Sequence, residues 1–231
     1  MKIALIGYGA MGRLIHRLAE EKGHVVAVTI DDADSGLSAA ELAGRLQGVD
    51  VAIDFTAAAA VRRNVEACVA AGVPLVEGTT GWNDSRTEIE SIVRDGGGAI
   101  VFGANFSIGV NLFYKIAEFA SELFARFPEY ETFIEEQHHS RKKDAPSGTA
   151  LKIKEIVTRH VEVGDIAATR AGNIPGTHTV GFDGPADQIT LTHTARSREG
   201  FALGAITAAE WIVGKTGFYE FGDVMDEILN K

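Results

Sequence analysis

The feature that most constrains the fold is the order of patterns in the first 31 residues. The apolar run Lys2–Ile6 is typical of a strand buried on both faces, and it leads directly into the glycine-rich turn Gly7-Tyr8-Gly9-Ala10-Met11-Gly12. A helical pattern follows to about Lys22, and a second apolar run, Val25–Ile30, ends at Asp31. Strand, GxGxxG turn, helix, strand and acid in this order predict a Rossmann-type dinucleotide-binding domain.

Each glycine of the turn has its own expected role. Gly7 makes the tight turn, Gly9 lets the backbone approach a pyrophosphate, and Gly12 lets the helix pack closely on the strand. The N-terminus of the following helix faces the phosphates, where its N–H groups and its dipole favour an anion. A glycine-rich turn that binds no ligand is the alternative, and the surrounding strand–helix–strand pattern argues against it.

Asp31 determines the expected choice of dinucleotide. It lies nineteen residues after Gly12, and its carboxylate would accept hydrogen bonds from the two adenosine ribose hydroxyls. The same carboxylate would repel a 2′-phosphate, and the next residue, Asp32, adds a second negative charge. These charges favour NADH over NADPH, although Arg13, directly after the third glycine, could offset a 2′-phosphate.

The alternation of apolar runs and helical stretches continues to about residue 106. Strands are expected at 49–55, 73–77 and 99–103, and helices at 38–46, 57–71 and 83–94. Ligands of open α/β sheets lie at the carboxyl ends of the strands. Five residues therefore fall on the ligand-binding edge of the predicted sheet: Gly7, Asp31, Phe55, Gly78 and Thr80.

After residue 107 the order of elements changes, which predicts a second domain. Strands at 131–137, 177–182 and 188–195 and helices at 148–161, 202–213 and within 217–231 are expected. The predicted fold is α/β, with a Rossmann-type domain of residues 1–106 and 207–231 and an α+β domain of residues 107–206 with a mixed or antiparallel sheet. A long helix at 108–127 should direct these apolar residues into the core: Val110, Phe113, Ile116, Ala117, Ala120, Leu123 and Phe124.

Composition limits the kinds of partner. The formal net charge of −10 over 231 residues makes nucleic-acid binding unexpected, and an anion needs a local concentration of positive charge. No apolar run approaches a membrane span, and the N-terminal run is too short for a secretory signal. Cys68 is the single cysteine, so no intrachain disulfide is expected. We expect a cytoplasmic protein with no membrane partner.

The positive charge is concentrated in His138-His139-Ser140-Arg141-Lys142-Lys143-Asp144-Ala145-Pro146-Ser147-Gly148-Thr149. Pro146 keeps the preceding residue out of helical geometry and lets a helix begin directly after it. Ser147 can cap that helix, and the N–H groups of Gly148 and Thr149 suit a carboxylate or phosphate. A plain Ser N-cap is the simpler interpretation, and the two are compatible.

The two histidines are adjacent at a strand end, so their side chains should point to opposite faces. We expect one imidazole of His138 and His139 to donate a proton and the other to contact a substrate carboxylate. Lys142, four residues beyond His138, would stabilise a developing negative charge. A solvated surface role is expected for Lys143 and Arg141.

Metal binding by this histidine pair is the weaker alternative. No Asp, Glu or His partner is expected at helical or hairpin ligand spacing, so no metal is predicted. The histidines at 160, 178 and 193 are expected to be mainly structural, with His193 and Arg196 as further candidates from the second domain.

These segments closely resemble the 4-hydroxy-tetrahydrodipicolinate reductase family, also called dihydrodipicolinate reductase. The most specific match is Glu-Gln-His-His-Ser-Arg-Lys-Lys-Asp-Ala-Pro-Ser-Gly-Thr-Ala, residues 136–150. The similarity covers essentially the whole chain and includes segments 7–13, 53–56, 78–81, 104–111, 170–172, 176–179, 191–198 and 217–219. The family's enzymes are typically homotetramers that assemble through the second domain.

The resemblance implies a reaction and a set of site residues. The reaction is the NAD(P)H-dependent reduction of 4-hydroxy-tetrahydrodipicolinate to tetrahydrodipicolinate in the diaminopimelate branch of lysine biosynthesis. His138 would be the proton donor or acceptor, with Lys142 as its cationic partner. The substrate carboxylates would be held by His139, Lys142, Ser147, Gly148 and Thr149. The dinucleotide would be bound by Gly7, Tyr8, Gly9, Ala10, Met11, Gly12, Asp31, Phe55, Gly78, Thr79, Thr80, Gly103, Ala104, Asn105 and Phe106.

Two departures from the longer members of that family stand out. The segment between Asp31 and Val51 is short, which predicts a trimmed helix, and Asp32 replaces a basic residue often found after the ribose-binding acid. Two other functions stay open: a related dehydrogenase, such as an aspartate dehydrogenase, and a non-catalytic sensor of NAD(H). The intact set of His138, Lys142 and residues 147–149 argues against a sensor, which has no need of it.

Overall fold

The computed structural model describes residues 1–230, and the chain forms two compact units. The first unit contains residues 1–108 and the segment that begins at Glu199, and the second contains residues 109–198. The boundary expected between residues 206 and 207 falls inside helix α7 (Glu199–Ile212), which lies in the first unit from its first residue.

The first unit is built on a parallel sheet of six strands in the order β10-β5-β4-β3-β1-β2. This doubly wound order confirms the predicted Rossmann-type fold, and the strand order reverses beside β1, where such sheets bind ligands. The strands are β1 (Lys2–Ile6), β2 (Val25–Ile30), β3 (Val51–Asp54), β4 (Leu75–Glu77), β5 (Ala99–Phe102) and β10 (Gly217–Glu220).

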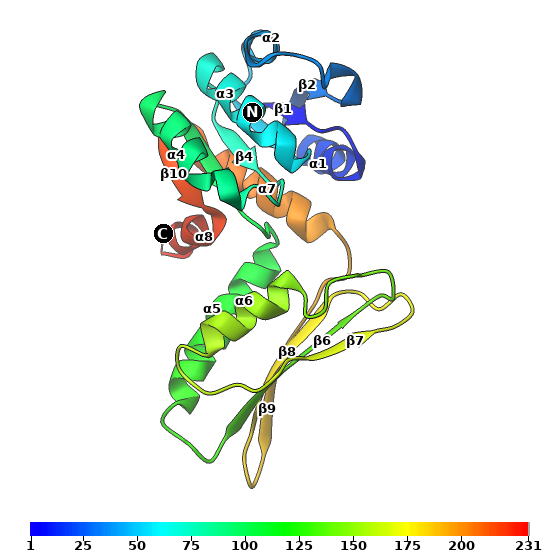
Figure 1. Ribbon diagram of the computed structural model, residues 1–231, viewed down its shortest axis with the longest axis vertical. Coiled ribbons are helices and arrows are strands. Elements are labelled where there is room, and N and C mark those ends of the chain that lie inside the picture. Colours follow the sequence, from blue (N-terminus) through cyan, green and yellow to red (C-terminus); the bar gives the residue numbers. More distant parts are fainter. Residues whose placement is uncertain (231) are drawn as a thin grey trace. The chain divides into compact units, whose positions relative to one another are not determined.

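The helices of this unit begin and end close to the predicted positions. In Figure 1, α1 lies beside α7, and α2 lies beside α3. The short helix α2 confirms the expectation at 38–46, because Ser38 caps it through a capping box with Glu41. Gly72 ends α3 in the left-handed region. The helices are α1 (Ala10–Glu21), α2 (Ala39–Arg45), α3 (Ala58–Ala71), α4 (Arg86–Asp95), α7 and α8 (Phe221–Leu229).

Strand β10 was missed, because the final segment was expected to hold only a helix. Residues 217–220 pair in parallel with β5, and Phe218 packs on Phe102 with 4.6 Å between ring centroids. Helix α8 then begins at Phe221. Four residues are too few for a periodic pattern to stand out, so only pairing with β5 identifies this strand.

The second unit has a mixed sheet of four strands in the order β7-β6-β8-β9, as predicted for the second domain. The β6–β7 pair is parallel and the β6–β8 and β8–β9 pairs are antiparallel. Helices α5 and α6 cover one face of this sheet (Figure 1). The elements are α5 (Ile108–Phe124), β6 (Glu131–His138), α6 (Gly148–Val157), β7 (Ala167–Arg170), β8 (Thr177–Asp183) and β9 (Gln188–Thr194).

Helix α5 is only partly buried, contrary to the prediction for two of its residues. Phe113 and Ala117 are buried against the sheet, and Phe124 stacks on Phe182 at 4.1 Å. Ile116 and Leu123, expected in the core, are 53% and 46% exposed. The apolar residues of α5 extend around more of the helix than one sheet can cover. Among residues 1–230, no helix combines the length and apolarity needed to cross a membrane.

Candidate functional site

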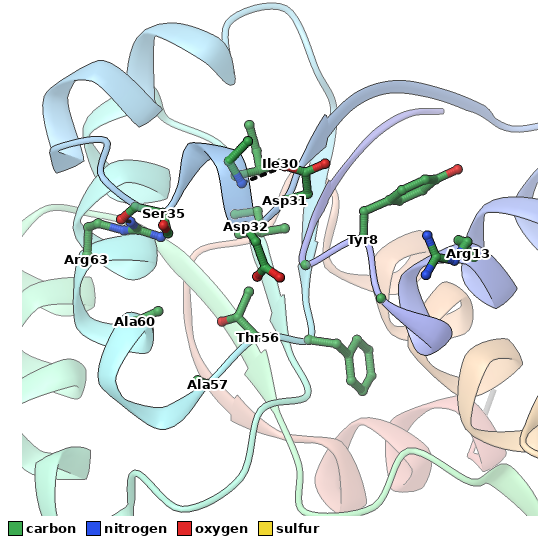
Figure 2. A pocket seen from close by; sticks show the side chains of 15 residues that line it. Tyr8, Arg13, Ile30, Asp31, Asp32, Ser35, Thr56, Ala57, Ala60 and Arg63 are labelled. Atoms are coloured by element: carbon green, nitrogen blue, oxygen red, sulfur yellow. Dashed lines mark hydrogen bonds between the residues drawn. The ribbon is translucent and has the colours of Figure 1, made fainter.

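The first unit contains a pocket of about 690 Å³ at the carboxyl ends of β1, β2 and β3 (Figure 2). Tyr8 and Arg13 line it from the glycine-rich turn and α1, and Asp31 and Asp32 line it from the loop after β2. Arg63 reaches it from α3. The pocket therefore lies where the strand order of the sheet predicts a dinucleotide.

The glycines of the turn occupy positions that other residues could not. Gly7 has φ +91°, and a Cβ there would lie 2.3 Å from the carbonyl oxygen of Phe55. A Cβ on Gly12 would lie 2.2 Å from the carbonyl oxygen of Gly7, so only glycine lets α1 pack here. Gly9 faces open space and is the N-cap of α1 without a side-chain cap. The start of α1 is thus open to an anion, which fits a pyrophosphate.

Asp31 is held in place at the mouth of β2. Its Oδ1 accepts a hydrogen bond from the N–H of Ala33 at 2.9 Å, and its side chain caps the short 3₁₀ turn Asp32–Asp34. Both Asp31 and Asp32 are exposed at the pocket. A carboxylate fixed in this way suits the ribose hydroxyls that the sequence assigns to it.

Arg63 is a pocket residue that sequence reasoning missed. Its guanidinium donates to the carbonyl oxygen of Ser35 at 2.6 Å and to Asn64 Oδ1 at 2.9 Å. It follows Asp31 by 32 residues and lies on α3, so no local pattern connects it with that residue. The pocket therefore has two guanidinium groups, those of Arg13 and Arg63, as well as two carboxylates.

The loops after β3 and β4 are joined by hydrogen bonds and packing. The N–H of Thr56 donates to Thr79 Oγ1 at 3.0 Å. A Cβ on Gly78 would lie 2.2 Å from the ring of Phe55, which packs edge-on against Phe106 at 6.3 Å. The predicted dinucleotide residues of these loops are thus brought together, with Thr79 and Phe106 buried beneath them. Thr80 and Ala104 are exposed, and Gly103 and Asn105 are half-buried.

A buried acidic pair lies directly beneath these loops and was not anticipated. Asp54 on β3 and Glu77 on β4 are neighbours in register, and both are 0% exposed. Burial raises the pKa of both carboxyls, and the charge of Asp54 raises the pKa of Glu77 further. Within residues 1–230, Asp54 Oδ1 and Glu77 Oε2 have no hydrogen-bond partner, and a proton on one of the two carboxyls would let it donate to the other. Asn64 donates to Asp54 Oδ2 at 2.6 Å.

The second unit brings four of its side chains together around the end of β6. His138, predicted as the proton donor, is the last residue of β6 and is buried. Glu136 lies two residues earlier on the same face, and its Oε2 is 3.3 Å from His138 Nδ1. His178 lies opposite on β8, with its Nε2 3.6 Å from the same oxygen. The other carboxylate oxygen of Glu136 is 2.6 Å from Arg170 Nη2.

The charges of this cluster differ from those expected for exposed groups. Burial lowers the pKa of His138, opposed by the charge of Glu136 and aided by those of Lys142 and Arg170. Burial and the nearby His138 lower the pKa of His178 to about 4. Burial by itself would raise the pKa of Glu136. Hydrogen bonds from Ser147 and Arg170 outweigh this effect and hold the pKa below its ordinary value. Glu136 is therefore ionised at neutral pH.

Ser147 caps α6 as predicted, and it also contacts the cluster. Its hydroxyl accepts a hydrogen bond from the N–H of Ala150 at 3.2 Å and lies 3.2 Å from His178 Nε2. Its own N–H donates to Glu136 Oε1 at 2.9 Å. A Cβ on Gly148, the first residue of α6, would meet nothing within 4 Å. The start of α6 thus offers backbone N–H groups next to open space, as an anion site requires.

The other predicted residues of this segment lie around the cluster. Lys142 is half-buried, and its Nζ pairs with Asp144 at 2.8 Å, so its direct partner is a carboxylate of the same loop and not His138. His139 is half-buried, follows the last residue of β6 and has no ion pair to Glu136. Thr149 lies in the first turn of α6.

Ligand-type residues do lie beside His138, at positions outside the helical and hairpin spacings considered in the sequence prediction. Atoms of Glu136, His138 and His178 that could ligate a metal lie within 4.8 Å of one another. Glu136 lies beside His138 because alternate residues of one strand share a face. His178 was treated as mainly structural, because its pairing with Glu136 depends on the register of β6 and β8. The guanidinium of Arg170, 2.6 Å from the same carboxylate, opposes a divalent cation there.

Comparison with known proteins agrees over both units. The family model for the N-terminus of dihydrodipicolinate reductase matches residues 1–106, and that for its C-terminus matches residues 109–225. A 4-hydroxy-tetrahydrodipicolinate reductase of Christiangramia forsetii is 35% identical and covers 99% of both chains. One of Archaeoglobus fulgidus is 37% identical, covering 98% of this chain and all of that protein.

Solved structures agree on the fold. Dipicolinate-bound dihydrodipicolinate reductase from Paenisporosarcina sp. TG-14 superposes with a TM-score of 0.78 over 97% of this chain and 99% of that one, at 21% identity. A probable dehydrogenase from Thermotoga maritima superposes with a TM-score of 0.62 at 10% identity, covering 99% of this chain and 94% of that one. The match of both family models over nearly the whole chain, together with the full-length relatives, shows that this chain belongs to the dihydrodipicolinate reductase family.

Proposed function

We propose that this protein reduces 4-hydroxy-tetrahydrodipicolinate to tetrahydrodipicolinate, with a nicotinamide dinucleotide as the source of hydride. The observation that carries the proposal is the cluster at the end of β6, where a buried imidazole, that of His138, and the open start of α6 are joined through Glu136. A proton donor beside an anion-binding turn matches a dicarboxylate that takes up hydride and a proton. Full-length relatives named for this reaction support it.

His138 and the residues around the start of α6 have separate proposed roles. The bound dinucleotide supplies hydride to the substrate ring, and water is lost from the 4-hydroxy form. His138 delivers a proton to the carbon next to the one that receives hydride. The N–H groups at the start of α6, with Ser147, Gly148 and Thr149, hold one substrate carboxylate. Lys142 and His139 contact the carboxylates and offset the negative charge that develops beside them.

Replacement of His138 by Gln tests the proton-transfer assignment. Gln keeps a polar side chain of similar reach but cannot deliver a proton, so turnover should fall by ~10²–10⁴-fold. The measurement is NADH oxidation in steady state with the freshly formed cyclic imine, together with the Kd for NADH, which should be unchanged because the pocket is in the other unit.

The same measurement separates the alternatives. His160→Gln is the matched control and should keep wild-type turnover, because His160 follows α6 and is not among the main influences on the pKa of Glu136. Unchanged turnover of His138→Gln would overturn the catalytic assignment. Oxidation of NADH with oxaloacetate and ammonia but not with the imine would point to an aspartate dehydrogenase. Binding of NADH without turnover on either substrate would point to a sensor.

We propose NADH as the preferred dinucleotide, since Asp31 and Asp32 place two carboxylates at the ribose end of the pocket. Use of NADPH would depend on Arg13 and Arg63. Arg63→Ala should therefore raise the KM for NADPH about 10-fold or more relative to that for NADH, the range of a hydrogen bond to a charged group. Arg62→Ala is the control, because Arg62 pairs with Glu66 and Glu88 instead. Equal changes for both dinucleotides would contradict this role.

We also propose that the protein assembles as a homotetramer through its second unit. Large apolar side chains of that unit are exposed on α5, α6 and β9. Exposed apolar surface of this kind marks sites of contact between proteins. The exposed side chains are Ile116, Phe119, Leu123, Leu151 and Ile189. Sedimentation equilibrium should give four times the 24.6 kDa chain mass. Phe119→Glu should shift the protein toward smaller species, and a wild-type monomer would contradict the proposal.

A further inference from the structure

The proposed reaction uses His138 and the start of α6 but gives no role to the carboxylate between them. Glu136 is 1% exposed, and its two oxygens face different partners. Oε1 accepts hydrogen bonds from the N–H of Ser147 at 2.9 Å and from Arg170 at 2.6 Å. Oε2 lies 3.3 Å from His138 Nδ1. One side chain thus contacts both the proton donor and the residue that caps the anion-binding helix.

Hydrogen bonding leaves the two facing atoms unsatisfied, although Glu136 Oε2 also lies 3.6 Å from His178 Nε2. Within residues 1–230, neither Glu136 Oε2 nor His138 Nδ1 has a hydrogen-bond partner, and both atoms are fully buried. Buried polar atoms in native proteins are nearly always paired, so a small rotation of the imidazole toward the carboxylate is expected to satisfy both. An ionised carboxylate only accepts, which places the proton of a neutral His138 on Nδ1.

We propose that Glu136 is a positioning residue that holds His138 with Nδ1 protonated, so that Nε2 is the nitrogen that exchanges a proton with the substrate. Gly176 lies on the side of the opposite nitrogen. Nε2 lies 3.0 Å from where a Cβ on Gly176 would be, so a side chain at this position would crowd that side of the ring. The catalytic role of Glu136 rests on the proposed function, whereas the tautomer of His138 can be measured in the protein without substrate.

The charge of Glu136 also offsets the cations around His138. The groups that face the imidazole are Glu136 on its own strand, Lys142 and Asp144 on the following loop, Arg170 on β7 and His178 on β8. Lys142 and Arg170 disfavour an imidazolium, and Glu136 is the buried anion that opposes them. Removal of its charge should therefore make the protonated, proton-donating form of His138 less populated at a given pH.

The first test is the state of His138 in the wild-type protein, which needs no variant to fold. Nitrogen-15 NMR of the histidine rings, assigned with His138→Gln, should show the Nδ1–H tautomer at neutral pH. An Nε2–H tautomer would overturn the proposal, whatever the enzyme's substrate. A spectrum of His138 that changes on addition of EDTA would assign the cluster to a metal and would also overturn it.

The second test is Glu136→Gln, which keeps the shape and loses the charge. We expect a mixture of tautomers, a lower pKa of His138 by NMR, and turnover reduced about 10- to 100-fold, part of what a general acid contributes. The decline of turnover on the alkaline side should move to lower pH, and the KM for the imine should change less than turnover. Glu136→Asp retains the charge and should restore the Nδ1–H tautomer and part of the turnover.

The matched control is Glu135→Gln, on the same strand with an exposed side chain. It should leave the tautomer, the pKa of His138 and the pH profile unchanged. A loss of turnover in Glu136→Gln with an unchanged tautomer and pH profile would indicate a structural role alone and overturn the proposal. If the wild type does not reduce the imine, the proposed function fails, and the NMR result still decides the role of Glu136.

Discussion

Both units bury acidic side chains near the carboxyl end of a strand, and they accommodate them in opposite ways. In the first unit Asp54 and Glu77 lie side by side, and burial is the largest influence on the pKa of each. Burial therefore raises both pKa values, and the pair retains a proton. In the second unit Glu136 is equally inaccessible, yet Arg170 and the N–H of Ser147 keep it ionised. The partners decide the charge, not the depth of burial.

The difference in charge between the two sites matches the groups that lie beside each carboxyl. Glu77 accepts a hydrogen bond from the N–H of Thr79 at 2.7 Å, so the acidic pair helps to organise the loops at the dinucleotide edge of the sheet. Glu136 lies beside an imidazole, where a negative charge changes the proton affinity. A pair that retains a proton suits a structural role beneath loops, and a fixed charge suits a role in proton transfer.

The largest expected effect comes from removing Arg170, the cation that helps to keep Glu136 ionised. Arg170→Met leaves Glu136 buried without its guanidinium, and loss of one partner of a buried pair costs about 3–5 kcal/mol. The free energy of unfolding is measured in urea at pH 7. Hydrogen exchange of the β6 amides reports separately on the second unit. The double variant Glu136→Gln with Arg170→Met should recover much of the loss, because no charge is then left unpaired.

Arg159→Met is the control for that change. Arg159 pairs with Glu118 and Glu155 at the surface, where its side chain is 50% exposed, so the loss should be less than about 1 kcal/mol. Similar losses for Arg159→Met and Arg170→Met would show that Glu136 does not depend on its cation, and the contrast between the two units would then fail.

The next effect is an opposite dependence of stability on pH. Glu77 has a folded pKa above the unfolded value of about 4.3, so its contribution is present below that pH and is lost as pH rises through the folded pKa. Glu77→Gln cannot ionise and should lose less stability on the alkaline side. Glu136 has a lowered folded pKa, so its contribution is lost as pH falls, and Glu136→Gln should flatten the acid side.

The measurement is the free energy of unfolding in urea from pH 3 to pH 9. In each variant the slope of the free energy of unfolding against pH should change by up to about 1.4 kcal/mol per pH unit, the value for one proton. Glu90→Gln, at an exposed position of α4, is the control and should match the wild type at every pH. Slopes that change on the same side of the pH range in both variants would contradict the opposite charge states.

The smallest effect concerns the helix cap beside Glu136. Ser147→Ala removes the hydroxyl that accepts from the N–H of Ala150 but keeps the N–H that donates to Glu136. The expected cost is about 1 kcal/mol, typical of a lost N-cap. Thr158→Ala at the other end of α6 should cost less than about 0.5 kcal/mol. A cost for Ser147→Ala above about 3 kcal/mol would mean that the hydroxyl also stabilises the charged cluster.

Much of the fold follows from patterns within a few residues of each other. The glycine-rich turn, the cap of α2 at Ser38 and the αL glycine at the end of α3 are all predictable, because each depends on local backbone geometry. Strands β7 and β10 are not, since each has four residues and exists only through pairing with a neighbour. The exposure of Ile116 has the same origin, because the sheet decides which part of α5 is covered.

The candidate sites divide in the same way. The sequence alone determines that a GxGxxG turn after the first strand, an acid after the second strand and a histidine before a capped helix are present, because each motif is contiguous. Only the tertiary structure brings Arg63 to the pocket and sets Glu136, Arg170 and His178 around His138. Those contacts depend on strand register and helix packing, which are decided by burial over the whole unit and not by neighbours in the chain.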